Sequence, residues 1–228
     1  MYSKYQIDKM LEIQNKFNVR EYGDNWVKGI HTNKHRINLG RSIYMKASGL
    51  MNLYHWEWDT YKEVDLNSNV IIYEFISILS FVISSTMSEV SFRGDNIIEN
   101  ASKFILNIKE SNLYSNLSSI EILENFLELG LILSKSKDTQ ERKLAIKNLF
   151  LLFNEINRSF LNNKGFELFM GNHILNNFKI SHGLRNGTYN DTLAGVKDKD
   201  FLLKIINNGT NYSDIEVELS KNYEQLKL

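Results

Sequence analysis

The chain has 228 residues, of which 43% are hydrophobic and 12% aromatic, ample for a packed core. Its 27 basic and 27 acidic residues balance, so no overall field draws it to nucleic acid or to an acidic membrane. It contains no cysteine, which excludes disulfides, thiolate catalysis and the usual zinc knuckles. We expect one domain over residues 1–228, located in the cytoplasm because the N-terminus lacks the apolar core of a signal peptide.

The absence of proline favours helices throughout, with Gly, Asn and Asp marking their ends, so the predicted fold class is all-α. Apolar spacing predicts a first helix over residues 5–17. A polar loop over 23–38 should follow, and then a second helix over 39–58.

After a polar break at 65–69, residues 70–87 form an almost continuous apolar run with one carboxylate, Glu74. A membrane span takes about 20 apolar residues. This run is marginal in length and carries serines at positions 77, 80, 84 and 85. A buried helix of a soluble bundle therefore explains it better than a transmembrane helix.

A second break is expected at 92–95, and capping pairs then mark later helices. Ser118-x-x-Glu121 and Asp138-x-x-Glu141 have capping-box spacing, in which a cap side chain and a glutamate satisfy each other's backbone donors. They predict helices over 120–136 and 139–161.

The last third of the chain should hold three more helices around an irregular loop. The helices are predicted over 167–180, 201–206 and 213–226, the last opened by Ser213-x-x-Glu216. The loop over 181–200 contains Gly183, Gly187 and Gly195, which would let backbone amides approach a ligand closely.

Several short motifs occur in an order that resembles the dimeric all-α dUTPases, whose relatives include the MazG-type nucleotide pyrophosphatases. The resemblance covers nearly the whole chain and implies an all-α helical bundle, a homodimer, a magnesium cofactor and a deoxyuridine nucleotide as substrate. Its pieces are Leu11-x-x-Gln14-x-x-x-Asn18, Asn25-Trp26, Ile43-Tyr44-Met45, Trp56-x-Trp58, Glu74, Leu175-Asn176-x-Phe178-Lys179, His182-Gly183, Gly187-x-Tyr189 and Gly195.

Hydrolysis of a nucleoside triphosphate uses Mg²⁺, which takes hard oxygen ligands. Carboxylates three residues apart on a helix point the same way, and the family carries such pairs on two facing helices. The matching positions here are Lys46, Gly49, Glu74 and Ser77, so Glu74 is the only retained metal ligand. A lysine near the metal positions would repel a cation, by about 4 kcal/mol at about 4 Å for an effective dielectric of about 20. We expect no magnesium here, and a Lys46 to Glu74 contact in its place.

The resemblance also implies residues that bind the base. Gln14 and Asn18 match base-reading residues and could hydrogen-bond a uracil edge. The next motif along the sequence is Asn25-Trp26, and Trp26 could form an aromatic wall of the base site. Without the resemblance, Gln14 and Asn18 are typical of a solvated helix face.

Two residues are the candidates for phosphate contacts. Lys179 matches a family arginine and keeps its charge but not its bidentate fork. Tyr189 is the second candidate, although both residues also fit ordinary loop polarity. The family's phosphate-binding lysine is replaced by Asn172 and its loop tryptophan by Leu193.

Three functions remain open. The first is a dUTPase-like pseudoenzyme that binds a nucleotide or a protein partner without Mg-dependent hydrolysis. The second is an active diphosphatase with a reduced metal site of Glu74 and carboxylates such as Asp59, Asp65 or Asp198. The third is a structural interaction protein whose cleft is closed.

Overall fold

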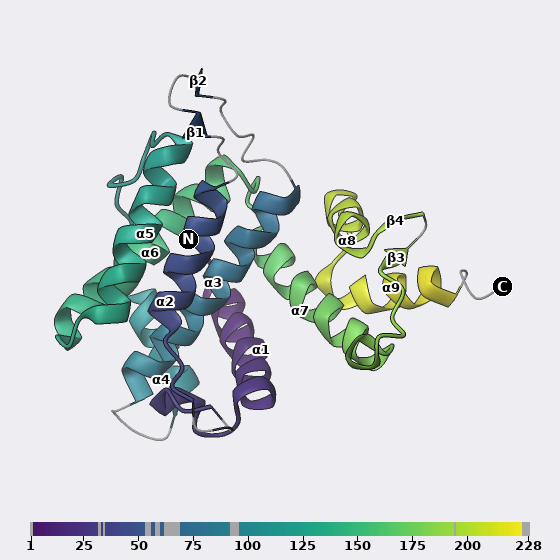
Figure 1. The fold of residues 1–228 in the computed structure, drawn as a ribbon, viewed down its shortest axis with the longest axis horizontal. Coiled ribbons are helices and arrows are strands. Elements are labelled where there is room, and N and C mark those ends of the chain that lie inside the picture. Colours follow the sequence, from purple (N-terminus) through teal and green to yellow (C-terminus); the bar gives the residue numbers. More distant parts are fainter. Residues whose placement is uncertain are drawn as a thin grey trace. The chain divides into compact units, whose positions relative to one another are not determined.

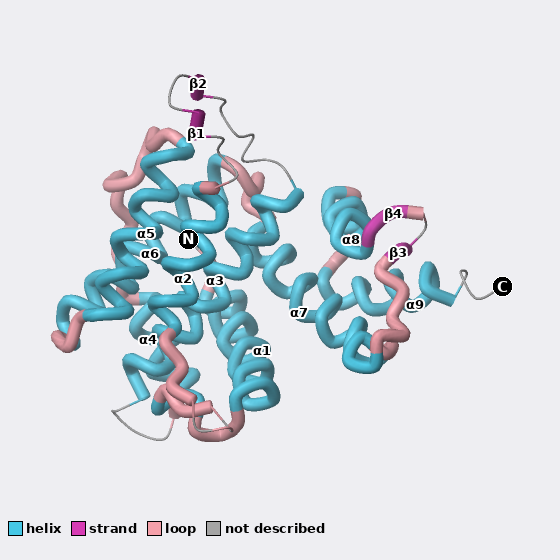
Figure 2. The backbone as a smooth tube through the Cα atoms, viewed as in Figure 1, coloured by secondary structure: helices cyan, strands magenta, loops and turns pink. Residues whose placement is uncertain are grey.

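The computed structural model describes residues 2–31, 33, 35–52, 56–57, 60–61, 69–91, 96–193 and 195–224. They are mostly helical, as predicted, and form nine α-helices with short 3₁₀ helices and two small hairpins (Figures 1 and 2). By contacts the chain divides into two compact units, residues 1–162 and 163–228, which are described separately below. The single domain over 1–228 stays a prediction.

Unit 1 is built around one central helix. The elements are α1 (Lys4–Tyr22), η1 (Trp26–Lys28), α2 (Leu39–Met51), β1 (Trp56–Glu57), β2 (Thr60–Tyr61), α3 (Asn69–Val90), α4 (Ile97–Leu106), α5 (Ser119–Lys135) and α6 (Thr139–Ser159). Helix α3 packs against α1, α2, α4 and α6 (Figure 1). Phe75 of α3, Phe126 of α5 and Phe153 of α6 form a ring series, with centroids 5.9 and 5.2 Å apart.

Helices α2 and α5 approach each other closely at two glycines. A Cβ added to Gly40 would lie 2.6 Å from the carbonyl carbon of Leu133, and one added to Gly130 would lie 2.9 Å from the amide nitrogen of Tyr44. These contacts are with backbone atoms, which cannot move aside as a flexible side chain can. Glycine at both positions therefore lets the two helices cross nearly backbone to backbone.

Among the described residues, α3 is the one helix long and apolar enough to cross a membrane, but 67% of its most apolar window is buried inside the chain. That burial is typical of the core helix of a soluble protein. Five of its hydroxyl groups are satisfied within the helix, because they donate to the carbonyl four residues earlier: those of Ser77, Ser80, Ser84, Ser85 and Thr86. The Ser88 hydroxyl donates instead to the carbonyl of Val27 at 2.7 Å.

Several predicted boundaries differ from the structure. The second helix was predicted over 39–58, but α2 ends at Met51 and β1 pairs with β2 shortly after it. Pairing in that hairpin overrides helical spacing, and aromatic and β-branched residues such as Trp56, Thr60 and Tyr61 suit a strand. Helix α4 was not predicted, although Asn96 caps it by accepting from the amide of Glu99 at 3.1 Å. Of the break predicted at 65–69, only Asn69 is described, and it begins α3 instead of lying in the break. The break predicted at 92–95 lies outside the described residues.

Two of the predicted capping boxes do not form. The Ser118–Glu121 box is confirmed at the start of α5. At α6, Asp138 accepts from the amide of Gln140 instead, and the Glu141 carboxylate accepts from the Ser136 hydroxyl. The Asp138 box was therefore wrong, because a nearer hydroxyl binds Glu141.

Unit 2 is a small three-helix unit with an irregular loop. Its elements are α7 (Gly165–Ser181), η3 (Leu184–Asn186), β3 (Thr192–Leu193), β4 (Val196–Lys197), α8 (Asp198–Asn207), η4 (Tyr212–Asp214) and α9 (Ile215–Glu224). Helix α7 packs against α8 and α9 (Figure 1). Ser213 lies inside η4 and its hydroxyl bonds Asp214, so the predicted Ser213–Glu216 box was wrong. In the loop, Gly183, Gly187 and Gly195 all have positive φ.

Candidate functional site

A cavity of about 860 Å³ lies in unit 1 between the loop after η1 and the helices α2 and α3. Its size suits a small organic ligand, since ligand pockets span about 300–1,000 Å³. The described residues that line it are Tyr22, His31, Asn33, His35, Arg36, Ile37, Asn38, Arg41, Ser42, Met45, Lys46, Gly49, Leu50, Val70, Glu74 and Phe81.

An ion pair joins α2 to α3 in the wall of this cavity. The Nζ atom of Lys46 lies 2.8 Å from Oε2 of Glu74, and the two side chains are 41% and 28% exposed. The predicted Lys46 to Glu74 contact is confirmed. Although Glu74 stands in an apolar run, its side chain lines the cavity and is only partly buried.

The other two positions matched to metal ligands offer little to a cation. Gly49 is exposed on the cavity wall, and a Cβ added there would meet nothing within 4 Å. Ser77 lies one turn from Glu74, and its hydroxyl donates to the carbonyl of Tyr73 at 2.9 Å. Mg²⁺ needs several free oxygen ligands. These positions do not supply them, because the Glu74 carboxylate is paired with an ammonium, Gly49 has no side chain, and the Ser77 hydroxyl already donates to a backbone carbonyl.

Gln14 and Asn18 form a buried chain of hydrogen bonds between α1 and α3. The amide of Gln14 donates to Oδ1 of Asn18 at 2.9 Å, and Nδ2 of Asn18 donates to the hydroxyl of Ser84 at 2.8 Å. Their exposed fractions are 2% and 1%. The solvated face expected in the absence of the resemblance was wrong. Neither residue is among those that line the 860 Å³ cavity, whereas Tyr22, one turn further along α1, is.

Asn25 and Trp26 also lie away from that cavity. Asn25 is exposed and makes no side-chain cap for η1. Trp26 is 1% exposed, and its indole nitrogen donates to Oδ1 of Asn15 at 3.2 Å. It lines a second cavity of about 260 Å³, so it forms no aromatic wall of the larger one.

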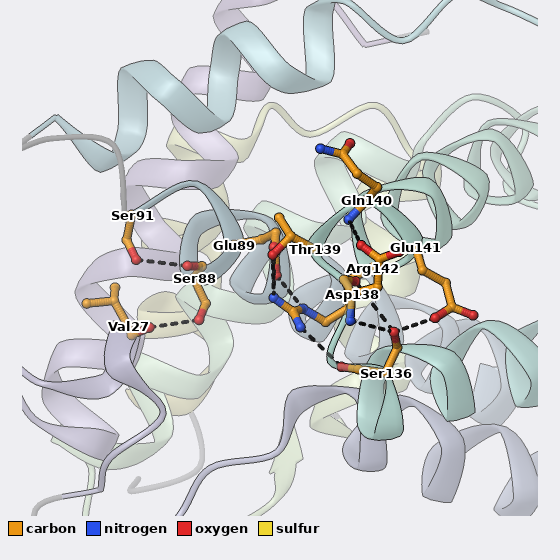
Figure 3. Close-up of polar contacts among 10 residues, drawn as sticks. All are labelled: Val27, Ser88, Glu89, Ser91, Ser136, Asp138, Thr139, Gln140, Glu141 and Arg142. Atoms are coloured by element: carbon orange, nitrogen blue, oxygen red, sulfur yellow. Dashed lines mark hydrogen bonds and ion pairs between the residues drawn. The ribbon is translucent and has the colours of Figure 1, made fainter.

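The second cavity contains a paired arginine and glutamate that the sequence did not reveal. Arg142 binds Glu89 with two parallel contacts, Nε to Oε2 at 2.8 Å and Nη2 to Oε1 at 3.1 Å (Figure 3). The carboxylate is only 9% exposed, and its hydrogen bonds raise the pKa of Arg142 further above the ordinary value. Arg142 also donates to the carbonyl of Ser136 at 3.1 Å, which ties α3, the end of α5 and the start of α6 together.

Lys179 and Tyr189 come together in unit 2, but around a carboxylate. Nζ of Lys179 lies 2.7 Å from Oδ2 of Asp198, and the Tyr189 hydroxyl donates to the same oxygen at 3.1 Å. Asp198 is 4% exposed. Burial, together with the Asp198 charge, raises the pKa of Tyr189 well above its ordinary value. As phosphate contacts, both residues would first have to release Asp198.

An aromatic cluster supports that arrangement. The rings of Tyr189 and Tyr223 stack at 5.7 Å with an interplanar angle of 5°, and those of Phe178 and His182 stack at 3.9 Å. The Lys179 ammonium lies 5.4 Å from the centre of the Tyr189 ring. The cluster therefore holds Lys179, Tyr189 and Asp198 as a packed and charge-paired group.

Sequence reasoning missed the basic lining of the larger cavity. Arg36, which forms a β-bridge with Ile30, and Arg41, in the first turn of α2, both line it, together with His31 and His35. The only sequence signal is Asn38, whose side chain caps α2 by accepting from the amide of Arg41 at 2.9 Å and so predicts the start of the helix. Nothing in the spacing shows that the loop folds over the helix.

Some candidate residues lie outside the described part of the chain: Trp58, Asp59 and Asp65. Within the described part, no group of three or more His, Asp or Glu side chains comes together to hold a metal ion. No protein-family model matches this chain, and no curated protein matches it either.

Proposed function

We propose that this chain is a dUTPase-like protein that binds a deoxyuridine nucleotide in the 860 Å³ cavity of unit 1 and has lost Mg-dependent hydrolysis. The observation that carries the proposal is the ion pair of Lys46 and Glu74 in the cavity wall. In this pair, Lys46 binds the one retained carboxylate that the resemblance assigns to the metal, that of Glu74.

The electrostatics of the cavity support binding without a metal. Its described lining contains the cations Arg36, Arg41 and Lys46 and a single carboxylate, Glu74. Such a surface favours a phosphate-bearing ligand directly, whereas a carboxylate-rich site needs a cation between protein and phosphate. Recognition of the base does not carry the proposal, since Gln14 and Asn18 bind each other and Ser84.

The test is calorimetric binding of dUMP and of dUTP in the presence of EDTA and in the presence of Mg²⁺, with release of pyrophosphate followed in parallel. We expect similar affinities in both buffers and no turnover. Deoxycytidine nucleotides are the matched control for base selectivity. Turnover at rates typical of enzymes, about 1 to 10³ per second, would contradict the proposal, as would the absence of any nucleotide binding.

The second candidate is a diphosphatase with a reduced metal site. Its favourable observation is that the Glu74 carboxylate is 28% exposed and faces the cavity, so it is accessible to a metal ion carried by substrate phosphates. Asp198 does not support it, because Lys179 and Tyr189 already bind that carboxylate in unit 2. A Glu74→Ala variant that loses measurable turnover would favour this candidate over the first.

The homodimer is a proposal that rests on the resemblance, and the cytoplasmic location stays a prediction. Met45 and Val70, at the rim of the cavity, are 61% and 63% exposed and offer apolar surface to a second copy. Analytical ultracentrifugation of the wild type and of Met45→Lys tests the dimer. An interaction protein with a closed cleft stays the third prediction, and failure of every nucleotide to bind would favour it.

A further inference from the structure

We propose that Arg36 and Arg41 form an anion-binding subsite at the N-terminal end of α2, and that it takes a pyrophosphate or phosphate-ester group directly, without a metal ion. The two side chains come from different elements, one from the loop after η1 and one from the first turn of the helix, and both line the 860 Å³ cavity. Binding of the phosphate group does not depend on the proposed function. The inference rests on the proposed function only for the identity of the organic group to which the phosphate is attached.

The charges of the two arginines are not balanced within the described structure. Lys46 is held by Glu74, but no described carboxylate lies within 4.0 Å of either arginine, and neither guanidinium group makes a hydrogen bond with a described residue. Two guanidinium groups around one cavity repel each other and attract an anion. An anion with two or more negative charges gains most, because planar guanidinium groups bind phosphate oxygens in pairs.

The end of α2 adds to this imbalance. A helix N-terminus carries partial positive charge and is stabilised by acidic residues, but the first turn of α2 contains none and has Arg41 instead. The Asn38 side chain caps the helix by accepting from the Arg41 amide at 2.9 Å. A phosphate group bound in the cavity would offset the charges of Arg36 and Arg41, both of which line it.

The experiment titrates inorganic pyrophosphate into the intact chain in the presence of EDTA. We expect saturable binding that weakens with added salt, because the two arginines are exposed. Arg36→Gln and Arg41→Gln should each weaken binding about 10- to 100-fold, as expected for the loss of hydrogen bonds between charged groups. Arg158→Gln is the matched control, since Arg158 is an exposed arginine on α6 that pairs with Glu155 outside this cavity.

A charge-reversed variant separates binding from folding. Arg41→Glu should abolish pyrophosphate binding and raise the melting temperature, because an acidic residue in the first turn suits the helix end and removes the repulsion with Arg36. A merely structural Arg41 would give a lower melting temperature in this variant, and that result would overturn the inference.

The remaining outcomes distinguish this inference from the proposed function. Absence of saturable pyrophosphate binding, or equal affinity in the wild type, Arg36→Gln and Arg41→Gln, overturns the anion subsite even if dUTP binds. Pyrophosphate binding that depends on both arginines supports the subsite even if deoxyuridine nucleotides bind no more tightly than pyrophosphate. In that case the proposed function fails alone.

Discussion

The ammonium of Lys46 and the carboxylate of Glu74 link α2 to α3 across the wall of the larger cavity, with 2.8 Å between Nζ and Oε2. Both side chains remain partly exposed, so water screens the pair. We expect a double-mutant cycle with Lys46→Ala and Glu74→Ala to give a coupling of about 0.2–1 kcal/mol in the free energy of unfolding. Urea denaturation measures it, and a coupling several times larger would mean that the cavity is drier than the structure shows.

Restoring the carboxylates should restore a metal site. The triple variant Lys46→Glu, Gly49→Glu, Ser77→Asp places four acidic side chains on the facing turns of α2 and α3, with open space at residue 49. Their repulsion should lower the melting temperature without metal, and Mg²⁺ should raise it again. Calorimetry should show Mg²⁺ binding to this variant. The double variant Lys46→Glu, Ser77→Asp, which lacks one ligand, is the control, and a triple variant that binds no metal would count against the resemblance.

Arg142 should matter more for stability than any exposed ion pair. Replacement by Met leaves the Glu89 carboxylate, 9% exposed, without its partner. We expect a loss of about 2–4 kcal/mol in the free energy of unfolding, measured in urea. Arg158→Met, at a pair whose arginine is 62% exposed, should cost less than about 1 kcal/mol.

A second variant separates loss of charge pairing from loss of packing at this site. Glu89→Gln combined with Arg142→Met removes both charges, so it should recover part of the stability lost in Arg142→Met alone. A double variant less stable than Arg142→Met would show that packing of the guanidinium, rather than the buried carboxylate, sets the cost.

Replacing Gly130 and Gly49 with alanine should change the stability of the protein in opposite directions. Gly130→Ala places a Cβ 2.9 Å from the Tyr44 amide nitrogen, so α2 and α5 must separate, at about 1–3 kcal/mol. Gly49→Ala meets nothing within 4 Å and should stabilise α2 by up to about 1 kcal/mol. Melting temperatures of the two variants check the signs. Equal effects would contradict the close crossing of the helices.

The packing of Tyr189 should make stability depend on pH in the alkaline range. Burial and the Asp198 carboxylate raise the pKa of its hydroxyl in the folded chain above the unfolded value near 10.0. Below that value both states are protonated, and above it only the unfolded state ionises, so the free energy of unfolding falls as the pH rises. We expect the wild type to lose more stability than Tyr189→Phe between about pH 9 and 11. Parallel pH dependences in the two proteins would contradict it.

The parts of the fold that follow from local chemistry were predictable. The absence of proline, the apolar spacing of α1 and the Ser118–Glu121 box all act within a few residues, and the structure agrees with them. Helix α4 went unpredicted because an Asn96 cap before a short apolar segment is a weak signal. The strand at Trp56 depends on its pairing with Tyr61, a contact that helical spacing cannot reveal.

The candidate site has the same limit: contacts that depend on how distant segments pack could not be predicted from the sequence. The Lys46 to Glu74 contact followed from the resemblance, which places those two residues on facing helices. Whether amides at positions 14 and 18 face water, a ligand or the core depends on the packing of α1 on α3, and the structure buries them against Ser84. The basic lining at Arg36 and Arg41 depends on how the loop after η1 folds, which no short motif encodes.

The close crossing of α2 and α5 has a consequence for binding kinetics. Gly40 fixes one side of α2 against α5, while Arg41, Lys46 and Gly49 lie on other sides of the helix and line the cavity. On the α2 side of the cavity a ligand therefore meets a wall whose backbone is already in place, so at Arg41 only the side chain loses freedom on association. Loosening that crossing with Gly130→Ala should weaken anion binding mainly through faster dissociation, although no atom of Gly130 touches the cavity.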